Sequence, residues 1–353
     1  MTQPLLQAAD LRGAARLTTD AVAEALSGWL APASTTEDPE QASRPERAAG
    51  LAVLNGLLGD HLAATGNPLA ITMALRQAGV TLPLERLALR ARLSRPTPRL
   101  LVLLHGLCMN DQQWRRAGHD DADGLAHELG YTPIHLHYNT GLSISTNGRI
   151  LALLMENLYD AWPMPIERLA MVGHSMGGLV ARSAIHHGLL IQRGRLRWPA
   201  RVADLVCLGT PHQGAPLERA GHGIDLLLGT APHAAPLARL AGLCSAGIND
   251  LRRGNVVPGP ASDDGTFRCE QVRLPVGTRC FAIAGCLGSA GEGLKSGLPG
   301  DGLVPVDSAL GHHDQPERRL DFAPERQAVV DRTNHLDLLS SAKVHGLLRQ
   351  WLR

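Results

Sequence analysis

The sequence has almost no lysine, little net charge and no long apolar run. Lys295 and Lys343 are the only lysines among the 34 basic residues of the 353-residue chain, and the formal net charge is +1. A chain this close to neutral offers no strongly basic surface, which excludes a nucleic acid or another polyanion as an expected partner. No apolar run approaches the roughly 18 residues of a membrane-spanning helix, so no such helix is expected.

Neither an export signal nor a metal-binding cysteine pattern is expected. Residues 1–6 carry no basic segment followed by an apolar core, as a signal peptide would. The six cysteines show none of the close pairings typical of metal ligands. We therefore expect a cytoplasmic protein with reduced thiols and no metal. A Cys269–Cys280 or Cys280–Cys286 disulfide is the less favoured alternative.

The N-terminal part differs from the rest because its apolar residues recur at helical spacing. This spacing predicts helices over residues 10–30, 46–64 and 68–93. A polar, proline-containing linker is expected near 31–45. The polar face of the first helix mixes acidic and arginine side chains, so packing against the main domain is favoured over peripheral contact with a membrane. We place a boundary near 97, with a helical N-terminal extension over residues 1–97 and the main domain over 98–353.

From residue 100 onward, expected strands and helices alternate. Strands are predicted at 100–104, 132–138, 168–172, 202–208, 279–284 and 326–331, and helices at 148–160, 177–190 and 339–351. Ser145, Thr146 and Asn147 are the candidate caps of the helix expected from 148. Such alternation predicts a mostly parallel sheet covered by helices on both faces. No strand is expected before residue 100, which makes the predicted sheet a reduced one that starts at 100–104.

The segment GHSMGG at residues 173–178 places Ser175 between an expected strand and an expected helix. A strand that turns directly into a helix forces the residue at the turn into a positive φ, and the glycines remove side chains that would collide there. The hydroxyl of Ser175 then stands on a sharp bend, with the N–H of Met176 directed at the same point. Ser175 is the candidate nucleophile, and the alternative is a glycine-rich turn with an incidental serine.

A second candidate group follows the strand at 100–104, which leads into His105-Gly106-Leu107. An oxyanion hole binds the negative oxygen of a tetrahedral intermediate and needs a second N–H from a loop of this kind. We assign the two donors to Leu107 and Met176. The alternative is an ordinary turn with a structural histidine.

An acid and a base are expected in two later loops. Asp301 lies between two glycines after the strand at 279–284, and a carboxylate on such a turn can orient a histidine and stabilise its charged form. His335 follows the last expected strand, from where it can act as general base and then as general acid. Weaker alternatives for the acid and the base are Asp307, Asp314, His312 and His313.

The order Ser175, Asp301, His335 is that of the α/β-hydrolase triad. Four segments carry a resemblance: HGL at 105–107, GHSMGGLVAR at 173–182, LGTPHQG at 208–214 and DGLVP at 301–305. Over about residues 99–351 the chain resembles the bacterial lipase/esterase branch of the α/β-hydrolase superfamily. The resemblance implies an α/β-hydrolase fold, the same three triad residues, the Leu107 and Met176 amides as oxyanion hole, and no cofactor. Some secreted lipases hold a calcium ion near the triad, but the spacing of Asp307 and Asp314 is too loose to predict one.

We therefore expect a serine hydrolase that cleaves carboxylic esters, of small molecules or lipids, through an acyl-Ser175 intermediate. One alternative is an intracellular acyltransferase or thioesterase with the same triad, because only the group that attacks the acyl-enzyme differs. Another alternative is a non-catalytic hydrolase fold that serves as a binding module. Nothing in the sequence indicates an oligomeric state.

A long insertion separates the strands at 202–208 and 279–284. Residues 214–266 contain two apolar clusters, which include Leu227 and Leu240. Unstructured connections of this length are uncommon in compact domains, so we expect one or two short helices. Because the insertion follows the carboxyl end of a strand, we expect it to cap the catalytic mouth, with Leu227 and Leu240 against an acyl chain.

Overall fold

The computed structural model describes several separate stretches of the chain. They comprise residues 45–93, 95–116, 119–191, 195–215, 245–258, 271–288 and 300–353. The helix expected at 10–30 and most of the linker near 31–45 lie outside the described residues. So does most of the capping insertion, including Leu227 and Leu240.

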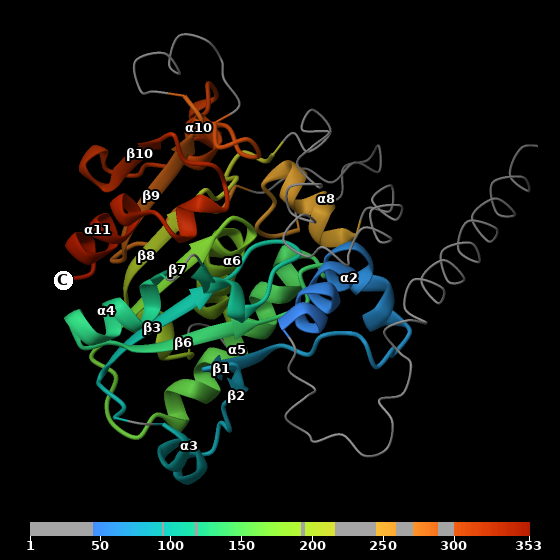
Figure 1. The fold of residues 1–353 in the computed structure, drawn as a ribbon, viewed down its shortest axis with the longest axis vertical. Helices are drawn as coiled ribbons and strands as arrows, with labels where there is room; N and C mark the ends of the chain where they lie inside the picture. Colours follow the sequence, from blue (N-terminus) through green and yellow to red (C-terminus); the bar gives the residue numbers. More distant parts are fainter. Residues whose placement is uncertain are drawn as a thin grey trace, which may run out of the picture.

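An eight-stranded sheet forms the centre of the molecule (Figure 1), in the order β10-β9-β8-β7-β3-β6-β1-β2. Its strands are β1 (Ala74–Gln77), β2 (Val80–Thr81), β3 (Arg99–Leu104), β6 (Thr132–His137), β7 (Arg168–His174), β8 (Val202–Leu208), β9 (Arg279–Cys286) and β10 (Gln327–Asp331). The six strands β10, β9, β8, β7, β3 and β6 pair in parallel, whereas β1 pairs antiparallel with β6 and with β2 at one edge. The short strands β4 (Arg115–Arg116) and β5 (His119–Asp120) form a separate pair.

Helices cover the sheet on both faces. The helices of the described residues are α2 (Pro45–Ala64), α3 (Arg86–Arg92), α4 (Asp121–Leu129), α5 (Ile144–Ala161), α6 (Met176–Leu190), α8 (Ala246–Arg253), α10 (Val306–Ala309) and α11 (Ala342–Trp351). The chain passes from β3 to β6 on one side of β3 and then returns to β7 on the other side. Because connections between parallel strands are right-handed, this reversal places α4 on one face of the sheet and α5 and α6 on the other. Accordingly, α5 packs against α6, while α4 contacts α11.

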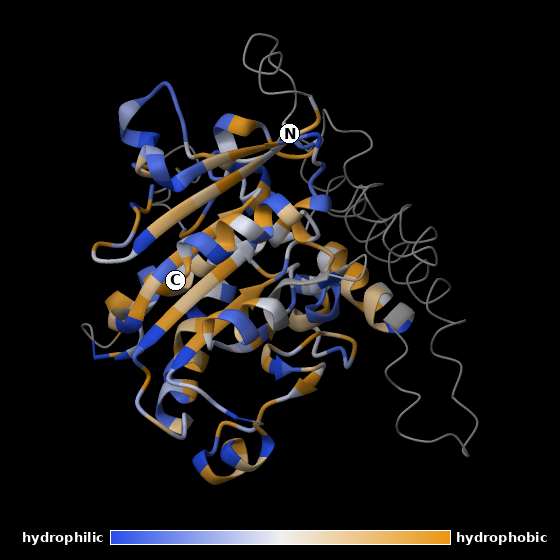
Figure 2. Cartoon of the chain, turned by 60° about the vertical axis from the view of Figure 1, so that its left-hand side comes forward, coloured by the Kyte–Doolittle hydropathy of each residue, from blue (hydrophilic) through white to orange (hydrophobic). Residues whose placement is uncertain are grey.

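The central strands are buried along almost their whole length. In β3, every residue from Leu100 to Leu104 is at most 1% exposed. Parallel strands with helices on both faces are typically continuous apolar runs of this kind. Figure 2 shows apolar residues along the middle of the strands and hydrophilic residues near strand ends. The loops that carry the candidate chemistry begin at the carboxyl ends of the strands.

The expectation of one helix over 68–93 is wrong, because this segment contains the β1–β2 hairpin. Ala78 and Gly79 join the two strands with φ angles of 52° and 78°. Two consecutive positive φ angles characterise the tight turn whose twist matches that of antiparallel strands. The strand β1 then gains a hydrogen-bond ladder with β6, which outweighs the helical spacing of its apolar residues. The sheet therefore does not start at the strand expected at 100–104, and only α3 remains helical in this segment.

The described part of the N-terminal region packs into the main core. Leu54 of α2 and Leu75 of β1 belong to the same buried cluster as Leu101 of β3. The helix expected from 148 begins earlier, at Ile144, where the Ser143 hydroxyl accepts the N–H of Thr146. That side chain is the cap, in place of the three candidates named from the sequence.

Two further expectations concern cysteines and membranes. Cys280 and Cys286 are free thiols, so the alternative disulfide between them is wrong. No helix within the described stretches is long and apolar enough to cross a membrane.

Candidate active site

Ser175 lies at the junction of β7 and α6, in a strained backbone conformation. Its φ is 55° and its ψ is −124°, a region that residues other than glycine rarely occupy. The backbone N–H of Ser175 donates to the carbonyl oxygen of Leu208 at 2.8 Å, which ties the turn to the end of β8. The strand, the turn and the helix therefore have the form of a nucleophile elbow.

Two glycines make this turn possible. A Cβ on Gly173 would overlap the backbone of Gly178, and a Cβ on Gly177 would overlap the carbonyl oxygen of Leu104. Leu104 is the last residue of β3, so the first turn of α6 begins in direct contact with the neighbouring strand. A side chain at either glycine would move Ser175 away from the loop that follows β3.

Asp301 and His335 form a buried hydrogen-bonded pair. Asp301 Oδ2 lies 2.7 Å from His335 Nδ1, and the two residues are 0% and 1% exposed. The other carboxylate oxygen, Oδ1, accepts the backbone N–H groups of Leu303 and Val304 at 3.0 and 2.8 Å. The N–H of His335 also donates to the carbonyl oxygen of Asp301 at 3.0 Å. The carboxylate thus favours the tautomer with the proton on Nδ1, which leaves Nε2 as the basic nitrogen.

The serine turn and the Asp–His pair meet at the end of β8. Ser175 is bonded to Leu208, and the next residue is Gly209. A Cβ on Gly209 would lie 3.2 Å from His335 Cε1 and 3.1 Å from Asp301 Oδ2. The structure therefore brings the three predicted triad residues to the same two-residue segment, Leu208-Gly209.

His174 makes a contact with His335 that the sequence did not predict. Its Nε2–H donates to the carbonyl oxygen of His335 at 2.9 Å, and the two ring centroids are 4.7 Å apart. Since His174 directly precedes Ser175, this hydrogen bond links the histidine loop to the serine turn. Its position beside Ser175 in the motif was the only available signal.

The two predicted oxyanion donors each follow a residue at the serine turn: Met176 follows Ser175, and Leu107 follows Gly106. Met176 is the first residue of α6, so its N–H has no partner within the helix. Leu107 follows Gly106, and a Cβ on Gly106 would lie 3.0 Å from the Cβ of Ser175. The loop after β3 therefore runs directly past the serine, and the assignment of the two N–H groups as an oxyanion hole stays a prediction.

The alternative acids and bases make contacts elsewhere. His312 Nδ1 lies 3.3 Å from Asp307 Oδ1, and His312 Nε2 lies 3.0 Å from Gln327 Oε1. Both His312 and Asp307 have exposed side chains, unlike the buried Asp301. Within the described residues, no group of three or more His, Cys, Asp or Glu side chains could hold a metal ion, and this includes the surroundings of Asp307 and Asp314.

Two other histidines near the site are buried and neutral. Burial lowers the pKa of His105 to about 3 and holds the pKa of His212 well below its usual value. His105 stacks on Tyr138 with ring centroids 4.4 Å apart, and His212 accepts a hydrogen bond from Arg182 at 3.1 Å. Nitrogens of such low proton affinity are poor general bases, so we assign both histidines structural roles.

A comparison with protein families finds a match to part of the chain. Residues 96–234 match the family described as PGAP1-like alpha/beta domain. A search of the curated proteins finds no match. The matched region begins just before β3 and includes the Ser175 turn. Together with the order of the sheet, the match confirms the α/β-hydrolase fold that the motifs predicted.

Solved structures with some similarity include a lipase and two esterases. The mature lipase BlEst2 of Bacillus licheniformis is 20% identical, with a TM-score of 0.48 over 80% of this chain and 98% of that one. A malate-bound thermophilic esterase from Thermogutta terrifontis is 16% identical, with a TM-score of 0.41 over 81% and 94% of the two chains. An esterase of Pyrococcus furiosus is 13% identical, with a TM-score of 0.40 over 73% and 85%. Likeness at this level does not identify a substrate or a mechanism.

Proposed function

We propose that the protein is a serine hydrolase that cleaves carboxylic esters. Ser175 is the nucleophile, His335 is the general base and acid, and Asp301 orients His335. The observation that carries the proposal is the buried Asp301–His335 pair beside the strained Ser175 turn, at the shared segment Leu208-Gly209. The three residues follow β7, β9 and β10, in the chain order of the α/β-hydrolase triad.

In the first half of the reaction, Ser175 Oγ attacks the ester carbonyl carbon and its proton passes to His335 Nε2. The π electrons of the carbonyl move onto its oxygen, and the N–H groups of Leu107 and Met176 stabilise the oxyanion. Asp301 stabilises the imidazolium through its bond with Nδ1–H. The imidazolium then protonates the leaving alcohol oxygen as the C–O bond breaks, which leaves an acyl-serine.

In the second half, water takes the place of Ser175 as the nucleophile. His335 Nε2 accepts a proton from the attacking water, and the oxyanion forms again beside Leu107 and Met176. When the bond to Ser175 Oγ breaks, the imidazolium returns its proton to the serine oxygen. The carboxylic acid leaves, and the site regains its starting state.

The test is the hydrolysis of p-nitrophenyl esters by the wild-type chain and by Ser175→Ala. We expect turnover by the wild type and a loss of kcat of about a million-fold in the variant, as is typical when a triad nucleophile is removed. Ser183→Ala is the matched control, because Ser183 lies in the same helix and donates to the carbonyl oxygen of Val256 at 2.7 Å. The control is expected to keep kcat. Full turnover by folded Ser175→Ala would exclude the proposal.

An acyltransferase or thioesterase would form the same acyl-Ser175 intermediate. Product analysis with an added alcohol, present in competition with water, separates acyl transfer from hydrolysis. A binding module would show no turnover at all. Ester turnover that is lost in Ser175→Ala would therefore exclude the binding module and leave the identity of the acyl acceptor to the product analysis.

A further inference from the structure

The loop that carries the proposed donor Leu107 contains a second strained residue, Cys108. Its φ is 59°, in the left-handed region that residues with a Cβ rarely adopt. Cys108 is 3% exposed, and burial raises the pKa of its thiol to about 12. It is therefore a neutral, packed side chain. Because Cys108 directly follows Leu107, its left-handed turn sets the path of the chain at the donor.

Two contacts hold Cys108 in this conformation. Its backbone N–H donates to Thr140 Oγ1 at 3.2 Å, in the loop after β6. Its sulfur packs on α2 at Gly56, where a Cβ would overlap the sulfur and lie 3.2 Å from the Cys108 Cα. Only a residue without a side chain allows α2 to approach the loop this closely.

The helix α2 is itself anchored on both sides of this contact. The side chain of Asn139, in the loop after β6, donates to the carbonyl oxygen of Gly59 at 2.8 Å. The hydroxyl of Ser245, the N-cap of α8, donates to the carbonyl oxygen of Gly56 at 2.7 Å. Figure 1 shows α2 beside α8, and the two helices are in contact. These bonds fix α2 over the loops at the carboxyl edge of the sheet.

We propose that α2 and Thr140 are positioning elements of the active site, which hold Cys108 in its left-handed conformation and thereby aim the Leu107 N–H at the oxyanion. The inference rests on the proposed function and assigns the N-terminal helix a part in it. A strained residue keeps its conformation only where its surroundings impose it. Without α2 the loop relaxes, and the lost hydrogen bond weakens binding of the oxyanion more than binding of the neutral ester.

Gly56→Ala is the first variant to test. Its methyl group overlaps the sulfur of Cys108, so we expect the loop to shift and kcat for p-nitrophenyl acetate to fall about tenfold or more, with little change in KM. Gly346→Ala in α11 is the matched control, because a Cβ there meets no atom within 4 Å. Both changes replace a helical glycine by alanine, so their effects on helix propensity are equal. The control is expected to keep both kcat and KM.

A trifluoromethyl ketone distinguishes a displaced donor from a general loss of structure. Ser175 Oγ adds to its carbonyl carbon, the serine proton passes to His335, and the carbonyl electrons form an oxyanion in the hole. We expect the Ki of this inhibitor to rise in Gly56→Ala by the same factor by which kcat/KM falls. A merely structural effect would lower the number of active sites, counted by fluorophosphonate titration, and leave the Ki of the active fraction unchanged.

Rescue variants test the contact itself. Cys108→Gly removes the sulfur and suits a positive φ, so Gly56→Ala/Cys108→Gly is expected to recover much of the kcat lost in Gly56→Ala. Thr140→Val removes the acceptor of the Cys108 N–H and is expected to lower kcat, whereas Thr140→Ser retains the hydroxyl and the activity. The Thr140 pair remains informative if Gly56→Ala does not fold.

Two results overturn the inference in distinguishable ways. If the wild type is active and kcat and Ki are unchanged in Thr140→Val and in folded Gly56→Ala, the positioning role is wrong and the proposed function stands. If the folded wild type shows neither ester turnover nor fluorophosphonate labelling, the proposed function is wrong and the inference falls with it.

Discussion

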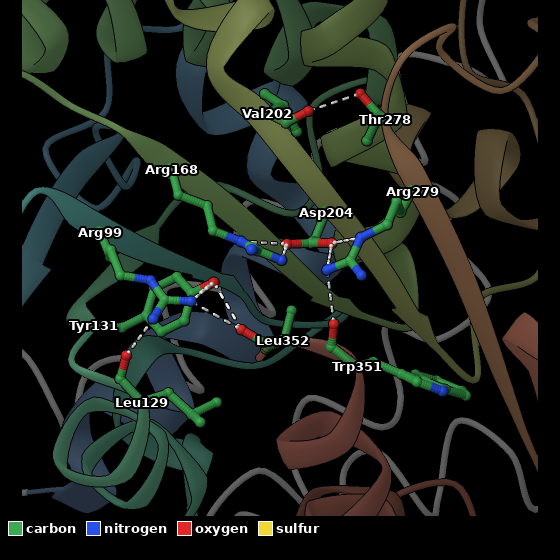
Figure 3. A network of polar contacts seen from close by, with 10 residues as sticks. All are labelled: Arg99, Leu129, Tyr131, Arg168, Val202, Asp204, Thr278, Arg279, Trp351 and Leu352. Carbon is green, nitrogen blue, oxygen red and sulfur yellow. Dashed lines mark hydrogen bonds and ion pairs between the residues drawn. The ribbon is translucent and has the colours of Figure 1, made fainter.

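The carboxyl and amino ends of the strands in the central sheet differ in the role of their charged and strained residues. At the carboxyl ends of the strands lie the positive-φ residue Ser175 and the buried Asp301–His335 pair. At the amino ends lies a network of arginines around Asp204, which bonds the strands to one another and to the C-terminal helix (Figure 3). The difference separates residues that serve stability from residues that serve the proposed chemistry.

Asp204 of β8 is 0% exposed and is bound from both neighbouring strands. Arg168, the first residue of β7, donates to Asp204 Oδ2 at 2.9 and 2.7 Å. Arg279, the first residue of β9, donates to Asp204 Oδ1 at 2.7 Å and to the carbonyl oxygen of Trp351 at 2.9 Å. A cation at the carboxyl end of a helix is favourable, and Trp351 is the last residue of α11. The network therefore joins three strands to the terminal helix.

Arg99 extends this arrangement to β3. It donates to the carbonyl oxygens of Leu129 and Leu352 at 2.9 and 3.2 Å, and the Tyr131 hydroxyl donates to the same Leu352 oxygen at 3.0 Å. The Arg99 guanidinium also lies 4.5 Å from the centroid of the Tyr131 ring. These residues sit at the edge of the sheet opposite Ser175, so we assign them to stability alone.

Changes at the carboxyl ends are expected to remove activity while the chain stays folded. His335→Ala is expected to lower kcat about a million-fold, as loss of the nucleophile does, because no other group accepts the serine proton. Asp301→Asn is expected to lose only about ten-thousand-fold, since Asp301 orients the histidine and transfers no proton. Ester hydrolysis and circular dichroism melts measure both effects. The exposed Asp307→Asn is the control, and a larger loss there than in Asp301→Asn would show that the acid is assigned wrongly.

A change at the amino ends of the strands is expected to lower stability and to leave activity intact. Asp204→Asn leaves two arginines without their carboxylate, and we expect a loss of about 3 kcal/mol in the free energy of unfolding. This is the low end for a broken buried pair, because Arg168 and Arg279 are partly exposed. The kcat of the folded variant is expected to stay within about threefold of the wild type, since surroundings far from the reacting atoms act mainly on stability.

Urea unfolding and ester hydrolysis on the same samples test this prediction. Asp321→Asn is the control, because Asp321 is an exposed carboxylate 3.8 Å from Arg273 and such pairs contribute little. A loss of kcat in Asp204→Asn without a loss of stability would break the division between the two ends.

The residues of the proposed site could be named from the sequence because each lies in or near a short motif at the end of a strand. The glycines around Ser175 and Asp301 are required by local backbone geometry, which a sequence displays directly. Asp204 belongs to no such motif. It is a single charged residue within an apolar strand, and nothing next to it in the sequence indicates its partners. Only the pairing of β8 with β7 and β9 reveals that Arg168 and Arg279 flank it.

The β1–β2 hairpin and the contact of α2 with Cys108 were not predicted, for different reasons. The turn Ala78-Gly79 lacks the Asn-Gly or Asp-Gly pair that marks tight hairpins, and the apolar residues around it also fit a helical period. Gly56 and Cys108 touch only in the folded chain, and no local pattern links residues so far apart in sequence.

The free energy of unfolding is expected to depend on pH through His105, a buried histidine in the loop after β3. The pKa of His105 falls from 6.5 to about 3 on folding, because burial disfavours its charged form. Between these values the unfolded chain binds a proton that the folded chain does not, so the free energy of unfolding falls as the pH decreases from about 6.5 toward 3. For this group alone the loss between pH 7 and pH 5 is about 2 kcal/mol.

The variant His105→Asn isolates this effect from that of other titrating groups. The amide keeps a donor for the Gly106 carbonyl, which His105 Nδ1 contacts at 3.0 Å, but it does not titrate. Urea unfolding at pH 7 and pH 5 is expected to show a loss about 2 kcal/mol smaller in the variant than in the wild type. Equal losses would show that His105 is protonated in the folded chain.

The smallest effect on activity is expected from changes to the leucines of the proposed cap over the carboxyl ends of the strands. If Leu227 and Leu240 contact an acyl chain, each change to alanine is expected to lower kcat/KM for long-chain esters about fivefold, or about 1 kcal/mol. Acetyl esters are expected to react unchanged. Profiles over C2 to C16 esters measure the effect, with the exposed Leu87→Ala of α3 as control. An unchanged profile with unchanged stability would mean that the insertion is not the acyl-binding cap.

Labelling with a fluorophosphonate probe, followed by peptide mass spectrometry, tests the proposed chemistry most directly. An activated serine oxygen attacks the phosphorus and displaces fluoride, which leaves a stable covalent adduct. We predict a single labelled residue, Ser175, on the folded wild-type protein, and no labelling of Ser175→Ala. Labelling of a different residue, or no labelling of the folded wild-type protein, would contradict the assignment of the carboxyl ends of the sheet as a serine hydrolase site.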